Sequence, residues 1–127
     1  MAKAGDTYEV VIQKAHLKWG TTRYTTSRTP IRGETYIKIP ARYARMYDLK
    51  RGDLFTAHFS NGFHSMVVRA AGNGPFESGI QYAKQFHGVG RGACKALTPW
   101  YAFCKAKVGD TIRVEFLSPT DVLFTKL

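Results

Sequence analysis

One stretch of this chain occurs twice, and this repetition constrains the fold more than any other feature of the sequence. The first copy, IPARYARMYDLKRGDLFTAHF, covers Ile39 to Phe59, and the second, LTPWYAFCKAKVGDTIRVEF, follows about sixty residues later at Leu97 to Phe116. Each copy has a proline, an aromatic-bearing segment and a Gly-Asp pair, with a phenylalanine six residues past the aspartate. We interpret the copies as a pseudo-twofold duplication, because each half alone would leave a sheet face uncovered.

Alternation of apolar and polar side chains predicts strands around both copies. The segments after the two Gly-Asp pairs, LFTAHF and TIRVEFL, alternate most clearly. Together with the turn signals that separate them, such segments predict seven short strands, at Tyr8 to Ala15, Thr35 to Pro40, Leu54 to Phe59, His64 to Ala70, Cys94 to Leu97, Thr111 to Leu117 and Val122 to Leu127.

Two short helices are expected directly after the prolines, because proline fits the first turn of a helix. ARYARMYDL spaces Tyr43, Met46 and Tyr47 three and four residues apart, which is the pattern of one helical face. In TPWYAFCKAK, Thr98 is the expected N-cap. The predicted fold class is therefore mainly β: a seven-stranded open pseudobarrel with two short helices at its ends.

The charge and size of the chain narrow the classes of partner. The formal net charge of +10 on 127 residues favours nucleic acid, because a positive field concentrates polyanions; anionic membranes and acidic proteins remain open. The length suits one domain, 1–127. No membrane helix or secretory signal is recognisable, so we expect an intracellular protein. Cys94 and Cys104 are expected to be buried thiols, and the scattered histidines predict no metal and no cofactor.

Two polar segments interrupt the strand pattern and are expected to project as loops. HLKWGTTRYTTSRTPIRGE follows the first strand and is rich in Thr, Ser, Gly and Arg. AGNGPFESGIQYAKQFHGVGRGA, from Ala71 to Ala93, follows the fourth strand, and its many glycines argue against a regular core element.

The order of these elements resembles the B3-like DNA-binding pseudobarrel. YIKIP, LKRGD and CKALTPWYAFCKAKVGD stand where plant B3 transcription factors carry a similar Ile-Pro stretch, helix and Gly-Asp turn. SRTPIRGETYIKIPARYA looks closer to the bacterial recognition domains of restriction endonucleases. The resemblance implies a monomer whose two arms grip double-stranded DNA from the major groove, without catalysis of its own. A nuclease domain or subunit would then be a partner.

The first arm has the chemistry of phosphate clamping and base reading. Arginine can donate two bonds to guanine, hydroxyls and lysine can bind phosphate, and threonine methyls can touch thymine. Its stretch from Lys18 to Arg32 contains no acidic residue. The candidate DNA-binding residues of this arm are Lys18, Trp19, Thr21, Thr22, Arg23, Tyr24, Thr25, Ser27, Arg28 and Arg32.

The second arm is less basic but offers amides and a carboxylate that suit adenine and cytosine. Its candidates are Asn73, Glu77, Gln81, Tyr82, Lys84, Gln85, His87, Arg91 and Lys95, while the aromatics Phe76, Tyr82 and Phe86 could instead pack beneath the loop. Four cations in and after the first helix could extend a phosphate track or form an ordinary solvated face: Arg42, Arg45, Lys50 and Arg51.

Three alternatives stay open. No nuclease motif is evident: HLKWGTTR begins like the His-x-Lys motif of phospholipase D-type nucleases but has Arg23 where the acid belongs. An RNA-binding or general nucleic-acid-binding basic barrel could stack unpaired bases on Trp19, Tyr24 and Phe63. A swapped-hairpin dimeric transcriptional regulator related to bacterial antitoxins shares the Ile-Pro helix and Gly-Asp turn, although the duplication within one chain counts against it.

Overall fold

The structure, a computed structural model, describes residues 2–13, 35–90 and 95–127. The first arm, Lys18 to Arg32, lies outside the described residues, and so do Arg91 and Cys94. Among the residues that are described, no helix is long and apolar enough to span a membrane.

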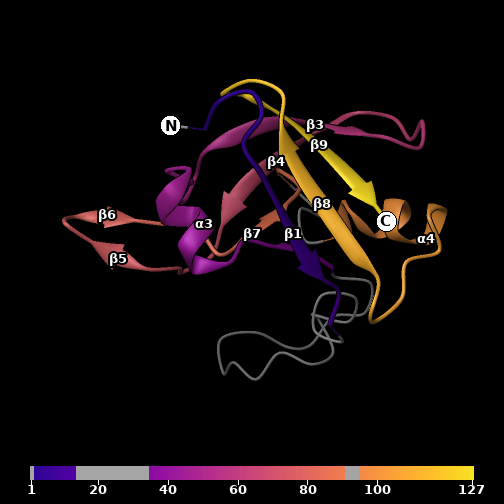
Figure 1. Cartoon of the computed structure of the whole chain (residues 1–127), viewed down its shortest axis with the longest axis horizontal. Coiled ribbons are helices and arrows are strands. Elements are labelled where there is room, and N and C mark those ends of the chain that lie inside the picture. Colours follow the sequence, from indigo (N-terminus) through magenta and orange to yellow (C-terminus); the bar gives the residue numbers. More distant parts are fainter. Residues whose placement is uncertain (1, 14–34, 91–94) are drawn as a thin grey trace.

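Seven strands form one mixed sheet that curls into a nearly closed barrel (Figure 1). Their order is β1-β8-β9-β3-β4-β7-β2; β3 and β9 are parallel and the other neighbours are antiparallel. The expected fold class is therefore confirmed. The strands are β1 Thr7–Val11, β2 Ile37–Lys38, β3 Leu54–Phe59, β4 Met66–Ala71, β7 Gln85–His87, β8 Thr111–Phe116 and β9 Asp121–Lys126.

Tyrosine hydroxyls bridge the seam that the sheet leaves open between its edge strands β1 and β2. Tyr8 of β1 donates to the carbonyl oxygen of Lys38 in β2 at 2.7 Å. Tyr47, which follows the first helix, donates to the Thr7 carbonyl at 2.6 Å and accepts from the Thr7 amide at 3.3 Å. These bonds satisfy backbone groups that no strand partner reaches within the described part of the chain.

Tyr8, at this seam, should make the stability of the protein fall at alkaline pH. Burial, reinforced by neighbouring Tyr101, raises the pKa of Tyr8 well above its usual 10.0. The folded chain therefore keeps a proton that the unfolded chain releases, so stability is full below pH 10 and falls above it by about 1.4 kcal/mol per pH unit for each such group. We expect Tyr8→Phe to lose about 1 kcal/mol at neutral pH and to flatten this alkaline decline.

Urea unfolding of both proteins between pH 8 and pH 11 measures this effect. The same alkaline slope in wild type and Tyr8→Phe would contradict the assignment of the buried proton to Tyr8.

The sequence repeat is also a repeat of backbone geometry. The helices α3, Ala41–Met46, and α4, Thr98–Phe103, have the same length, and 57 residues separate equivalent positions, as from Asp53 to Asp110. Asp53 accepts from the amide of Lys50 at 3.1 Å, and Asp110 accepts from the amide of Lys107 at 3.0 Å. The glycine before each aspartate has a positive φ, 98° and 97°, which a residue with a side chain rarely adopts. Each copy therefore closes with the same aspartate-capped turn.

Aromatic rings fill the barrel. Phe124 in β9 lies 5.7 Å from Phe59, 5.6 Å from Phe86 and 6.2 Å from Trp100, measured between ring centroids. All four side chains are buried, and Trp100 belongs to α4, which closes one end of the barrel. The core therefore joins residues from both copies of the repeat.

One expected strand is wrong. Lys95–Leu97 forms a helical turn, and the barrel strand between β4 and α4 is β7, which lies within the segment predicted to be a loop. The apolar side of β7 is short, because only Phe86 among its three residues is a large apolar side chain. Pairing with both β4 and β2 stabilises it, and the sequence pattern carries no sign of that long-range pairing.

Details of both helices also differ from expectation. Met46 is 65% exposed, so the predicted face is wrong at this residue; Tyr43 and Tyr47 do pack against the core, and Ala44 beside them is fully buried. Thr98 is the first helical residue rather than the N-cap; Leu97 takes the cap position without a side-chain bond, and the Thr98 hydroxyl lies 3.0 Å from that of Thr35. Cys104 is half-buried rather than buried.

Candidate nucleic-acid interface

The described part of the second arm is a β-hairpin rather than an irregular loop. Strands β5, Phe76–Glu77, and β6, Ile80–Gln81, form a small separate sheet between β4 and β7 that projects away from the barrel (Figure 1). Ser78 and Gly79 connect them, with φ of 51° and 78°. Positive φ at both central residues is the requirement of a type I′ hairpin turn. The arm thus ends in a tight two-residue tip.

The side-chain amide of Gln81 and the close backbone approach at Gly74 fix the base of the hairpin. Gln81 Nε2 lies 3.0 Å from the Gly74 carbonyl oxygen and 2.9 Å from that of Tyr82, so it donates across the hairpin base. A Cβ on Gly74 would lie 2.5 Å from the Ala83 carbonyl oxygen, closer than real Cβ atoms come. The backbone approach that shapes the arm therefore requires glycine at this position.

Backbone hydrogen bonds join the turn after α3 to the arm. Arg51 donates its amide to the Gln81 carbonyl at 2.9 Å, and Ala83 donates to the Leu49 carbonyl at 3.0 Å. Lys50 pairs with Tyr82 as an isolated antiparallel bridge. The hairpin is consequently held in a fixed position relative to α3 and its turn.

Two side-chain contacts complete this attachment. Arg45 of α3 donates Nε to Glu77 Oε1 at 2.8 Å, and both side chains are about half exposed. Arg51 donates Nη1 to Asn73 Oδ1 at 2.9 Å. Glu77 and Asn73, which the sequence suggested as base-reading groups, therefore orient arginines in this structure. Gln81 is likewise engaged with the arm's own backbone.

The other expected second-arm residues lie in varied settings. Lys84 and Lys95 are exposed, and Tyr82 is half-buried. His87 is half-buried, with Nδ1 2.8 Å from the Gly88 carbonyl oxygen. Gln85 is 3% exposed in β7, so its side-chain amide is not accessible to DNA in this conformation. Gln85 therefore lies outside the candidate interface.

Five exposed cations lie on α3, on the turn that follows it and on the arm itself. Arg42 lies with its guanidinium carbon 4.6 Å from the ring centre of Tyr43 and donates Nη2 to the Tyr43 hydroxyl at 2.6 Å. Lys50 Nζ lies 3.6 Å from Asp48 Oδ2. These exposed pairs are weak and can exchange for a phosphate at little cost. The cluster, called the junction cations below, consists of Arg42, Arg45, Lys50, Arg51 and Lys84.

The sequence pattern missed one exposed aromatic in this region. Phe76 was an alternative candidate for packing beneath the loop, yet it is 68% exposed, whereas Phe86 is buried and Tyr82 is partly buried. The Ser-Gly pair two residues after Phe76 is the only signal that could have placed it beside a hairpin tip.

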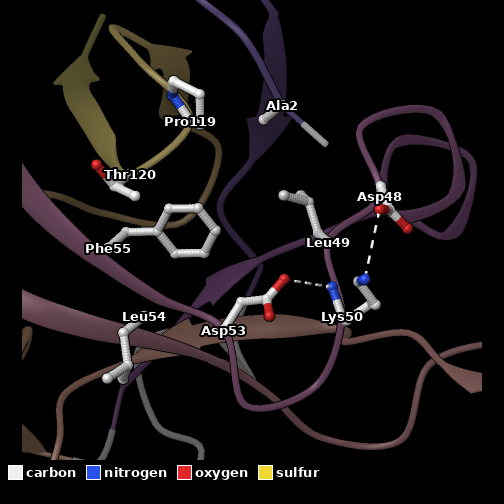
Figure 2. A pocket seen from close by; sticks show the side chains of 9 residues that line it. All are labelled: Ala2, Asp48, Leu49, Lys50, Asp53, Leu54, Phe55, Pro119 and Thr120. Atoms are coloured by element: carbon white, nitrogen blue, oxygen red, sulfur yellow. Dashed lines mark hydrogen bonds and ion pairs between the residues drawn. The ribbon is translucent and has the colours of Figure 1, made fainter.

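A small pocket lies beside the turn that carries two of the junction cations. It has a volume of about 180 Å³ and is lined by charged groups of the turn and by an apolar floor that includes Leu49 and Phe55 (Figure 2). Lys50 Nζ lies 3.6 Å from Asp48 Oδ2, and the backbone amide of Lys50 donates to Asp53 Oδ2. The charged side chains that line the pocket therefore already have partners within it.

A hydrogen-bonded chain lies elsewhere, on β3 and β9. His58 Nδ1 is 3.1 Å from the Ser65 hydroxyl, and His58 Nε2 is 3.1 Å from Asp121 Oδ1. Hydrogen bonds from His58 first, and then from Ser118, lower the pKa of the Asp121 carboxyl. The pocket described above is not lined by these residues. Their evident effect is to tie β3 to the start of β9.

Comparison with known protein families and with curated proteins finds no match. The fold is thus a mixed seven-stranded pseudobarrel that the geometry alone defines.

Proposed function

We propose that this protein binds double-stranded DNA sequence-specifically, as a B3-like recognition domain. The observation that carries the proposal is the fixed β5–β6 hairpin with exposed cations on the arm, on α3 and on the turn that joins them. The major groove of DNA is wide enough to admit a two-stranded β-ribbon, and cations beside such a ribbon meet the phosphates that border the groove.

The contacts at the junction explain how the arm could read DNA. Arg45 and Arg51 are the groups that can bind phosphate or donate two bonds to guanine, and their partners Glu77 and Asn73 orient them. A fixed arm loses little conformational freedom on binding, which favours affinity. The net charge of +10 supplies long-range attraction.

The resemblance to bacterial recognition domains extends the proposal to biological context. A nuclease domain or subunit would supply the chemistry, and the barrel would act as an intracellular monomer. The first arm, with Arg23 and Arg28, would grip the duplex together with the hairpin.

A randomised duplex pool, bound at two salt concentrations and sequenced after enrichment, tests the proposal. We expect a short enriched motif and a log-log salt slope of about −4.5 to −6, from roughly 5 to 7 phosphate contacts. Salt-sensitive binding without a motif would overturn sequence specificity. Tighter binding to single-stranded RNA than to any duplex would instead establish the RNA-binding alternative.

A further inference from the structure

We propose that Phe76 recognises the C5-methyl group of a pyrimidine in the major groove, either of thymine or of 5-methylcytosine. This inference rests on the proposed function and assigns a reading role to a residue of the arm. Phe76 is the most exposed large hydrophobic side chain among the described residues, at 68%.

The hairpin geometry directs Phe76 away from the barrel. Successive side chains of a strand point to opposite faces. Glu77, the next residue of β5, contacts Arg45 on α3. Phe76 therefore lies on the face of the hairpin that is turned away from α3, where a ligand can reach it.

The surroundings of Phe76 indicate what it contacts. A single exposed apolar side chain is common and by itself implies no partner. Here the arm that carries it is fixed by Gly74 and Gln81, and the exposed cations Arg51 and Lys84 lie at its base. Such charges favour a polyanion. The apolar group that duplex DNA presents in its major groove is the C5-methyl of thymine, to which 5-methylation of cytosine adds an equivalent.

A double-mutant cycle, in which the Phe76 ring and the pyrimidine methyl group are removed separately and together, tests the contact. Each thymine of the enriched motif is replaced in turn by deoxyuridine, which lacks only the methyl group, and affinity is measured for wild type and Phe76→Ala by fluorescence anisotropy. We expect one replacement to weaken wild-type binding by about fourfold, the effect of exposing one methyl-sized group. Phe76→Ala should bind the thymine duplex more weakly and should be indifferent to that replacement.

A second arm of the experiment replaces cytosines of the motif by 5-methylcytosine. If Phe76 faces a cytosine, methylation should raise wild-type affinity by a similar factor and leave Phe76→Ala unchanged. The two arms together distinguish the two sources of the methyl group.

Phe103→Ala is the matched control, because Phe103 is also an exposed phenylalanine, at 55%, but belongs to α4. It should keep the full dependence on the methyl group. If every methyl substitution changes wild type and Phe76→Ala equally, the inference is overturned while DNA binding stands. If wild type binds no duplex, the inference and the proposed function both fail.

Discussion

Phe124→Ala is expected to lower the free energy of unfolding by about 3–5 kcal/mol, the usual loss when a buried phenylalanine is removed from a core. Phe124 is fully buried and packs against rings from β3, β7 and α4. Its strand, β9, lies between β8 and β3, the equivalent strands of the two copies. The substitution would therefore leave a cavity where the two copies of the repeat meet. Chemical denaturation measures the loss in the free energy of unfolding.

Phe76→Ala provides the control for this prediction. It removes the same side chain from an exposed position, so the free energy of unfolding should change by less than about 0.5 kcal/mol. Similar losses in the two variants would contradict the assignment of Phe124 to the core and of Phe76 to the surface. Unchanged stability of Phe76→Ala also qualifies that variant for the DNA experiments.

Replacing Lys50 and Arg51 together by glutamine is expected to weaken duplex binding by about thirtyfold at 0.15 M salt. Loss of two phosphate contacts should make the log-log salt slope about 1.8 less steep, and this difference in slope corresponds to that loss of affinity. Both residues are exposed at the point where the turn after α3 joins the hairpin. Anisotropy titrations over a range of salt concentrations give both quantities.

The repeat offers a control with matched charge and similar local structure. Lys107 is the equivalent of Lys50, since each donates its amide to the aspartate of its own turn, and Lys105 lies two residues before it. Both are exposed near α4, which Figure 1 places across the barrel from α3 and the hairpin. Lys105→Gln with Lys107→Gln removes the same charge and should leave most of the affinity and slope intact. Equal losses would indicate that only net charge attracts DNA.

The part of the fold that could be predicted from sequence is the part that the repeat encodes. Proline, Gly-Asp and alternating strands act over a few residues, so α3, α4, β3 and β8 follow from local rules of turn and strand chemistry. The buried sides of LFTAHF and TIRVEFL were predictable for the same reason. On α3, Tyr43 and Tyr47 pack against the core as predicted, whereas Met46 is exposed and Ala44 is buried, because the spacing of large side chains carries no sign that a small one is enclosed.

The structure of the second arm could not be predicted from local sequence patterns. Glycines and amides indicated a loop, whereas tertiary pairing made β7 a strand of the barrel and placed Gln85 inside it. Asn73 and Glu77 were recognisable as polar groups that could read bases. Their arginine partners lie 22 and 32 residues away in the sequence, and no local pattern connects such positions.

The sequence by itself determined the duplication, the strand-rich class and the positive charge, because composition and short-range periodicity carry these properties. Tertiary structure decided the strand order, the tyrosine-bridged seam, the fixed hairpin and the exposure of Phe76. Those features depend on contacts between distant segments, such as Tyr8 with Lys38 and Leu49 with Ala83. Such contacts form only when the whole barrel closes, because each half alone leaves its apolar face without a partner.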